Sequence, residues 1–303
     1  MHISITMKEK TVFQKNYYTE RLLSRSHYSE VWLAKDVCTN VYVALKIYAD
    51  TCLENDGLER IKEELSIMSN IRHKNLLSPY FYDVFEGRPW AVFPYCKNGN
   101  LLEAIGQFSE EQVWMLIRDV SNALSFLHSL HPPKVYQSVK PDNIIIDDEG
   151  NYLLTDWRSL DIQYQIKKSL KRETWGAGNC DYLAPERFGR KNIPTIENDI
   201  YALGITVYEV LTGNTPFGEY GGQCQKLGAS IPDLEGNYSE QLKNSIKQCL
   251  ALEPWDRPSA QQLALLSETA LKGKKWYSHT ILYYLYSIRK FFPTHQKSNN
   301  SKK

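Results

Sequence analysis

The chain has 303 residues, more than one hydrophobic core usually holds, so we expect two lobes or two domains. Hydrophobic residues make up 42% of the sequence and charged residues 23%, which excludes a disordered chain, a collagen-like repeat and a bundle of membrane helices. The net charge of +1 does not indicate a nucleic-acid-binding protein.

Cysteine usage and the two ends of the chain bear on where the protein works. The six cysteines include no CxxC pair, so we expect reduced thiols and a cytoplasmic protein. Residues 1–10 lack the apolar stretch of a secretory signal. The longest apolar run near the C-terminus, residues 281–288, is too short to span a membrane.

The first hundred residues are predicted to form short strands around one helix. Residues 30–34 and 42–48 are rich in β-forming residues and are separated by a hairpin connection at 36–40. A helix follows, with apolar residues at three- and four-residue spacing: Leu58, Ile61, Leu65, Met68 and Ile71. Two more short strands come next, and the second, at 90–93, ends at Pro94.

Beyond residue 100 the pattern becomes helical. Ser109 and Gln112 predict a capping box before a helix with apolar residues at Val113, Leu116, Ile117, Val120, Leu124 and Leu127. Residues 143–146 and 152–155 predict a small hairpin that turns at 149–151. Residues 201–211 are apolar on nearly every face and predict a fully buried helix.

A last capping box, Ser259 with Gln262, begins a helix that contains Leu263, Leu265 and Leu266. The chain shows no internal repeat and no low-complexity linker. Strands therefore come first and helices second, which predicts an α+β architecture of two lobes.

Seven short motifs occur in the order typical of the eukaryotic-type protein kinase family, which the chain resembles over roughly residues 16–270. They are VALKIY at 43–48, EELSIMSNIRHKNLL at 63–77, VYQSVKPDN at 135–143, TDWR at 155–158, LAPE at 183–186, DIYALG at 199–204 and DRP at 256–258. The ordered set is far more specific than any single motif. The resemblance implies a small β-rich N-lobe at 14–97, a larger helical C-lobe at 98–270 and a C-terminal tail at 271–303.

The resemblance also implies a site for ATP and Mg²⁺. Lys46 would reach the α- and β-phosphates with Glu64 as its partner, and Asn143 and Asp156 would offer oxygen ligands to the metal. The remaining predicted cofactor-binding residues are Val31, Ala44, Phe93, Tyr95, Cys96 and Ile145, with Phe93 as gatekeeper before the hinge at 94–96. Taken singly, the lysine and glutamate also fit solvated surface charges, and the aspartate and asparagine also fit loop caps.

Three further residues would brace the C-lobe. Glu186 and Arg257 resemble the buried ion pair of the family, in which loss of one partner would strand a charge. Asp199 either binds the backbone of the catalytic loop or caps the N-terminus of the buried helix.

The departure from the family that most affects catalysis lies in the catalytic loop. A kinase has His-Arg-Asp where this chain has Tyr136, Gln137 and Ser138. The aspartate of the family orients the substrate hydroxyl and accepts its proton, and a serine is not a useful base near neutral pH. Lys140 is retained and would neutralise the γ-phosphate.

Two other departures affect the phosphate site. The glycine-rich loop, expected at 23–31, has serine at all three glycine positions, so nucleotide affinity should fall. Trp157 and Arg158 follow Asp156 where the family has Phe-Gly, so Arg158 either favours one conformation of the segment or places its guanidinium to hold an anion at the phosphate site. The activation segment offers Ser159, Ser169 and Thr174 as phosphoacceptors, but Gln137 replaces the usual phosphate-binding arginine.

These features support three hypotheses. The first is a pseudokinase that binds ATP weakly and regulates other proteins by contact, such as an active kinase in a signalling pathway. The second is an active or residual Ser/Thr protein kinase, because phosphoryl transfer depends mainly on positioning and electrostatics. The third is a nucleotide-independent scaffold whose site is filled by Tyr28, Trp157 and Arg158. In each case the partner is a protein and not a nucleic acid.

The C-terminal tail differs in charge from the rest of the chain. Residues 272–303 contain eight basic and no acidic residues, and subtracting those eight charges from +1 leaves −7 on the remainder. Aromatic residues are interspersed: Trp276, Tyr277, Tyr283, Tyr284, Tyr286, Phe291 and Phe292. Such a segment can lie on an anionic membrane, dock on the acidic body or a partner, or form a helix packed on the domain.

Overall fold

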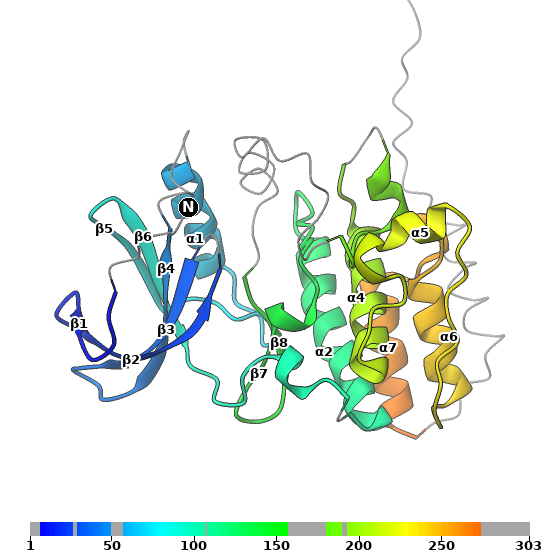
Figure 1. Ribbon diagram of the computed structural model, residues 1–303, viewed down its shortest axis with the longest axis horizontal. Helices are drawn as coiled ribbons and strands as arrows, with labels where there is room; N and C mark the ends of the chain where they lie inside the picture. The colour runs from blue at the N-terminus through cyan, green and yellow to red at the C-terminus, as the bar shows by residue number, and fades with distance from the viewer. Residues whose placement is uncertain are drawn as a thin grey trace, which may run out of the picture.

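A computed structural model describes residues 7–26, 29–49, 57–106, 108–156, 180–189 and 193–273. The strands and one helix of the first lobe lie side by side with the helices of the second (Figure 1). The two-lobed α+β architecture expected from the sequence is confirmed. None of the described helices has the length and apolar character needed to cross a bilayer.

Within the described residues, six strands form one antiparallel sheet in the order β1-β2-β3-β4-β6-β5. They are β1 (Val12–Phe13), β2 (Tyr17–Arg25), β3 (Ser29–Asp36), β4 (Tyr42–Tyr48), β5 (Phe81–Phe85) and β6 (Arg88–Pro94). The sequence patterns did not predict β1 and β2. The pairing of β2 with β3 has two register shifts, which break the alternation of buried and exposed residues that identifies a strand.

The sheet carries a separate apolar cluster on each face. On one face, helix α1 (Gly57–Asn70) buries Ile61, Leu65 and Met68 against Ala91 and Phe93 of β6. The predicted helical spacing of these apolar residues is therefore confirmed. The opposite face is built around Trp32, Val43, Leu45, Ile47 and Trp90.

Aspartates shape the two predicted turns. Asp36 Oδ1 accepts hydrogen bonds from the amides of Cys38 and Thr39, both at 2.9 Å, between β3 and β4. In the second lobe, Asp147 Oδ1 accepts from the amide of Asn151 at 2.7 Å, between β7 (Ile144–Ile146) and β8 (Tyr152–Leu154). Gly150 in that turn has a φ of +83°, which glycine adopts without steric cost. Both predicted hairpins are confirmed.

The second lobe packs its helices around one large apolar cluster. Its helices are α2 (Glu110–Ser129), α4 (Ile196–Thr212), α5 (Gly222–Lys226), α6 (Glu240–Cys249) and α7 (Ala260–Leu271). Short 3₁₀ turns are η2 (Leu101–Ala104), η3 (Pro141–Asn143), η4 (Pro185–Phe188), η5 (Gly218–Tyr220) and η6 (Pro254–Asp256). Helix α2 contacts α7, α4 and β8, so it forms the centre of the lobe.

Local capping signals located the helix ends better than apolar content did. The predicted boxes at Ser109 and Ser259 are present, with Gln112 and Gln262 as their partners. Helix α4 begins five residues before the predicted 201–211, because its first turn is polar and therefore outside the apolar pattern.

The expected ion pair braces this lobe, with its arginine fully buried and its glutamate side chain 25% exposed. Arg257 donates to both carboxylate oxygens of Glu186, at 2.7 and 2.8 Å, and its side chain is fully buried. It also donates to the carbonyls of Ala251, Glu197 and Leu252, and the guanidinium lies 4.8 Å from the centre of the Tyr201 ring. These contacts satisfy the charge, which would otherwise be costly to bury.

Candidate active site

The predicted adenine-binding residues come mostly from one face of the sheet. Val31 lies opposite Lys46 in the strand register, and Ala44 lies opposite Phe93. Directly paired residues on neighbouring strands point to the same face, and so do Ala44 and Lys46, which are two positions apart on β4. These four side chains therefore share a face. The opposite face is the one closed by the tryptophan-containing cluster.

The second lobe and the hinge add to this apolar surface. Ile145 on β7 and Cys96 after β6 join Ala44 and Phe93 in the cluster that packs against α1. Burial, together with the nearby carboxylates at 147–149, raises the pKa of the Cys96 thiol to about 11, so the thiol is neutral. Tyr95 lies outside this cluster and packs edge-on against Tyr42.

A lysine on the same face of the sheet pairs with an aspartate from the second lobe. Lys46 Nζ on β4 donates to Asp156 Oδ1, 110 residues later in the chain. The lysine side chain is only 8% exposed and the aspartate 23%. Asp156 has a φ of +58°, which a non-glycine residue adopts only when its surroundings hold it there.

Glu64, the predicted partner of Lys46, lies on α1 and is half-buried, whereas the neighbouring Glu63 is exposed. This difference places Glu64 on the side of the helix that faces the lobe. The ion pair between Lys46 and Glu64 stays a prediction.

Asp199 at the start of α4 holds the catalytic loop. Its carboxylate accepts from the backbone amides of Tyr136 at 2.8 Å and Gln137 at 2.6 Å, and its Oδ2 lies 2.8 Å from His128 Nε2. Gln137 has a φ of +65°, and these hydrogen bonds stabilise that unusual backbone conformation. The first of the two roles considered for Asp199 is confirmed, while Thr195 caps the helix.

A second set of hydrogen bonds joins the loop to the chain next to Asp156, a predicted metal ligand. The Tyr136 hydroxyl donates to the carbonyl of Thr155, the residue before Asp156. The Thr155 amide donates to the Asn143 carbonyl at 2.9 Å, and Asn143 Nδ2 donates to the Ser138 carbonyl at 2.9 Å. The network therefore brings Ser138, Asn143 and Asp156 together, and no local sequence pattern indicated Tyr136 as its centre.

Charges around Lys140 were also missed by the sequence patterns. Lys140 Nζ lies 3.3 Å from Asp142 Oδ2, and Asp142 and Asp181 both act on the carboxylate of Glu209. Burial raises the pKa of Glu209 above its usual value, while a hydrogen bond from the Tyr182 hydroxyl opposes that rise. The loop lacks the family's aspartate at Ser138, but its surroundings remain acidic.

The residues present fit a magnesium–nucleotide complex. Mg²⁺ prefers a few carboxylate or amide oxygens together with phosphate and water. The Nδ2 group of Asn143 donates to Ser138, which leaves the amide oxygen as its acceptor, and Asp156 supplies a carboxylate. Lys46 supplies a mostly buried cation for the phosphates.

Serines close the loop where the family has glycines. The Ser29 amide donates to Ser26 Oγ at 3.1 Å, and the Ser26 amide donates to the Ser29 carbonyl at 2.9 Å. Next to them, the buried Glu30 pairs with Arg25 at 2.7 Å and accepts from Trp32 Nε1 at 2.9 Å. The ends of the β2–β3 turn are thus tied together by side chains.

Several predicted features lie outside the described residues. They are Tyr28, Trp157, Arg158, the phosphoacceptors Ser159, Ser169 and Thr174, and the tail at 274–303.

Comparison with known proteins agrees with the geometry. The protein kinase domain family matches residues 17–266. An Aurora kinase of Schizosaccharomyces pombe is 30% identical over 251 residues, which cover 80% of this chain and 68% of that protein. Sporulation-specific protein 1 of Saccharomyces cerevisiae is 28% identical over 271 residues (86% and 53%), and an Aurora kinase of Encephalitozoon cuniculi is 26% identical over 246 residues (78% and 88%). The chain belongs to the eukaryotic-type protein kinase family.

Proposed function

We propose that this protein is a pseudokinase, which binds ATP weakly and acts through contacts with other proteins. The observation that carries the proposal is Ser138 at the position of the catalytic base, within a loop whose supporting contacts are otherwise present. A hydroxyl there cannot accept a proton near neutral pH as a carboxylate can. The site would therefore bind nucleotide but lacks the carboxylate that would accept the proton.

Nucleotide binding follows from the charged groups that remain. Lys46 would neutralise the α- and β-phosphates, and Asn143 and Asp156 would hold Mg²⁺, which neutralises phosphate charge when bound. The Lys46–Asp156 ion pair keeps both side chains next to the predicted adenine-binding residues. Serine in place of glycine at positions 26 and 29 argues for weak affinity.

The test is a thermal-shift titration with ATP and magnesium. Each variant is compared with its own melting temperature without nucleotide, because Lys46→Ala also removes the partner of Asp156. We expect the wild-type protein to be stabilised and Lys46→Ala to lose that response. Lys247→Ala is the matched control, because Lys247 pairs with Asp233 on the surface of the second lobe. An equal nucleotide response in wild type and Lys46→Ala would contradict the proposed site.

A residual Ser/Thr protein kinase is the second candidate. Lys140 is retained beside the loop, and loss of a general base typically costs about 10²–10⁴ in rate and not the whole of catalysis. Incubation with labelled ATP distinguishes the two candidates. Phosphate transfer that disappears in Asp156→Ala would overturn the pseudokinase proposal.

Two further properties belong to this proposal. The partner is a protein that is regulated or modified by contact, with no role for nucleic acid. We place the protein in the cytoplasm, since the described cysteines are free thiols. A nucleotide-independent scaffold becomes the better description if ATP shows no saturable binding at millimolar concentration.

A further inference from the structure

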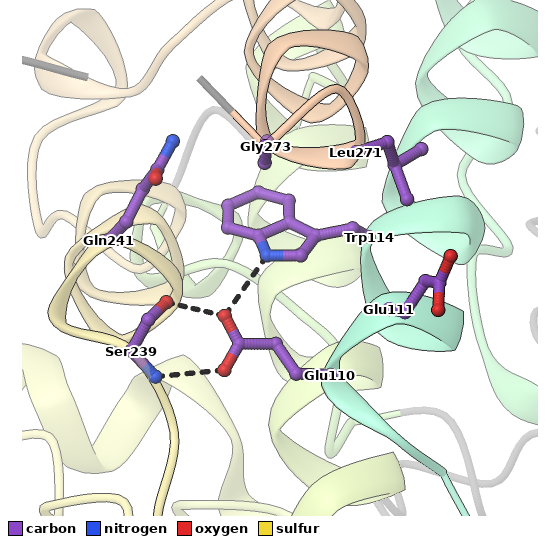
Figure 2. Close-up of a pocket in the computed structure, with 8 residues that line it drawn as sticks. Glu110, Glu111, Trp114, Ser239, Gln241, Leu271 and Gly273 are labelled. Carbon is purple, nitrogen blue, oxygen red and sulfur yellow. Dashed lines mark hydrogen bonds between the residues drawn. The ribbon is translucent and has the colours of Figure 1, made fainter. Parts of the chain in front are cut away.

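A pocket of about 370 Å³ lies in the second lobe and shares no residue with the predicted nucleotide site. It is formed where the first turns of α2 and α6 meet the C-terminal end of α7 (Figure 2). This volume is at the small end of the range for ligand pockets, which is about 300–1,000 Å³. It suits one or two aromatic side chains better than a large ligand.

The wall of the pocket is held in place by Glu110. Its Oε1 accepts from Trp114 Nε1 at 3.1 Å and from the Ser239 hydroxyl, and its Oε2 accepts from the Ser239 amide at 2.8 Å. Ser239 is the N-cap of α6, so one carboxylate of α2 holds the Trp114 ring and also links α2 to the N-terminus of α6. Figure 2 shows that ring between Glu110 and Gly273. Trp114 is only 4% exposed, so the pocket is backed by a buried aromatic ring whose orientation is fixed.

Two polar groups in the pocket are available to a ligand. Gln241 Nε2 is buried and has no hydrogen-bond partner among the described residues. Glu111 lies at the rim with its side chain exposed. A buried amide without a partner is costly, so the pocket favours an occupant that brings an acceptor. Glu111 favours one that also carries positive charge.

The chain itself supplies such an occupant at the edge of the pocket. Gly273, the last described residue, is one of the lining residues. Lys274, Lys275, Trp276 and Tyr277 follow it directly. A chain extends at most about 3.3–3.6 Å per residue, so the Cα of Trp276 lies within about 11 Å of the Cα of Gly273. The backbone of this segment also provides carbonyl acceptors.

We propose that residues 274–277 fold back into this pocket, with Trp276 against Trp114 and the two lysines near Glu111. The −7 charge of the chain before residue 272 and the absence of acids after it favour this contact. Docking in cis has a high effective concentration, because the segment is joined directly to the rim. The proposal does not depend on whether nucleotide binds.

The first test is photo-crosslinking in the full-length chain. Trp276 is replaced by benzoylphenylalanine, and Ser301 is replaced in the same way as a matched control at the far end of the tail. We expect position 276 to crosslink within one chain to residues 110–114 or 239–241, and position 301 not to do so. Crosslinks to other surfaces, or only between two chains, would overturn docking in cis.

The second test uses trypsin cleavage after Lys274 and Lys275, followed by mass spectrometry. Docking should slow this cleavage relative to cleavage after Lys297. Trp276→Ala removes an aromatic anchor and should accelerate it about 30-fold. Glu111→Gln leaves the cleaved sequence intact and should accelerate it about 2- to 5-fold, as expected for an exposed charge pair.

The exposed Glu219 provides the control for this charge, because it does not line the pocket. Glu219→Gln should leave the cleavage rate unchanged, and both glutamine variants should keep the melting temperature of the wild type. If cleavage after Lys275 is as fast in wild type as in Trp276→Ala and Glu111→Gln, the segment is not docked.

Discussion

The side of the site proposed to bind phosphate and the catalytic loop depart from the family in different ways. On the proposed phosphate side, Lys46 and Asp156 form an ion pair and supply the charged side chains that the proposed nucleotide binding requires. In the loop, the contacts that set its shape are present, but Ser138 has replaced the group that would do the chemistry. The shape of this loop therefore depends on its backbone contacts, whereas its reactivity depends on the side chain at position 138.

The reason is that the loop is held mainly through its backbone. Asp199 binds the amide groups of residues 136 and 137, which any residue other than proline supplies. Asn143 binds the carbonyl of Ser138 and not its side chain. The side chain at position 138 can therefore change while the loop keeps its course.

Restoring a carboxylate at position 138 should have the largest effect. If the loop keeps its shape, Ser138→Asp should place a base where the family has one and raise phosphate transfer from labelled ATP by about 10²–10⁴. Ser138→Asn is the matched control, because asparagine has nearly the same size as aspartate and carries no charge. Equal rates in the two variants would show that the base is not the only defect, and the serines at positions 26 and 29 would be the next to change.

Removing the support of the loop should have the next largest effect. Asp199→Ala leaves two backbone amides and His128 without their acceptor, and we expect a loss of about 3 kcal/mol in the free energy of unfolding. Ser138→Ala should cost under about 0.5 kcal/mol, because the carbonyl that binds Asn143 is retained. Urea denaturation followed by circular dichroism measures both values. A cost for Ser138→Ala close to that for Asp199→Ala would show that the side chain also shapes the loop.

Sequence patterns predicted the local parts of this structure well. The capping boxes at Ser109 and Ser259 and the spacing of apolar residues in α1 depend on neighbours within one or two turns. Helix α6 also has apolar residues at helical spacing, Leu242, Ile246 and Cys249, which are buried. The helix was not predicted, because most of its other residues are polar. Strand β2 was not readable, because its register shifts remove the period of two.

The site depends on contacts that no local pattern contains. The Lys46–Asp156 pair joins residues 110 positions apart, and only the resemblance to a family suggested that they meet. The hydrogen bond from Tyr182 to Glu209 and the nearby Asp142 come from three separate segments of the second lobe. Such clusters are set by packing, so composition and spacing could not predict them.

The acidic surroundings of Lys140 allow the smallest and most specific prediction. Burial raises the pKa of Glu209, so its ionised form costs stability above the folded-state pKa, whereas below the usual value of 4.5 both folded and unfolded states are protonated and the cost disappears. Glu209→Gln keeps an acceptor for the Tyr182 hydroxyl and removes the charge. We expect its melting temperature to exceed that of wild type by about 1–2 °C at pH 7.5 and to match it near pH 4.

Differential scanning calorimetry at the two pH values measures this difference. Glu219→Gln removes the same formal charge from an exposed position and should show little change at either pH. A gain for Glu209→Gln that is the same at pH 4 and pH 7.5 would mean that the variant acts through packing and not through charge. A gain confined to pH 7.5 would show that the ionised form of the partly buried Glu209 carboxylate costs stability.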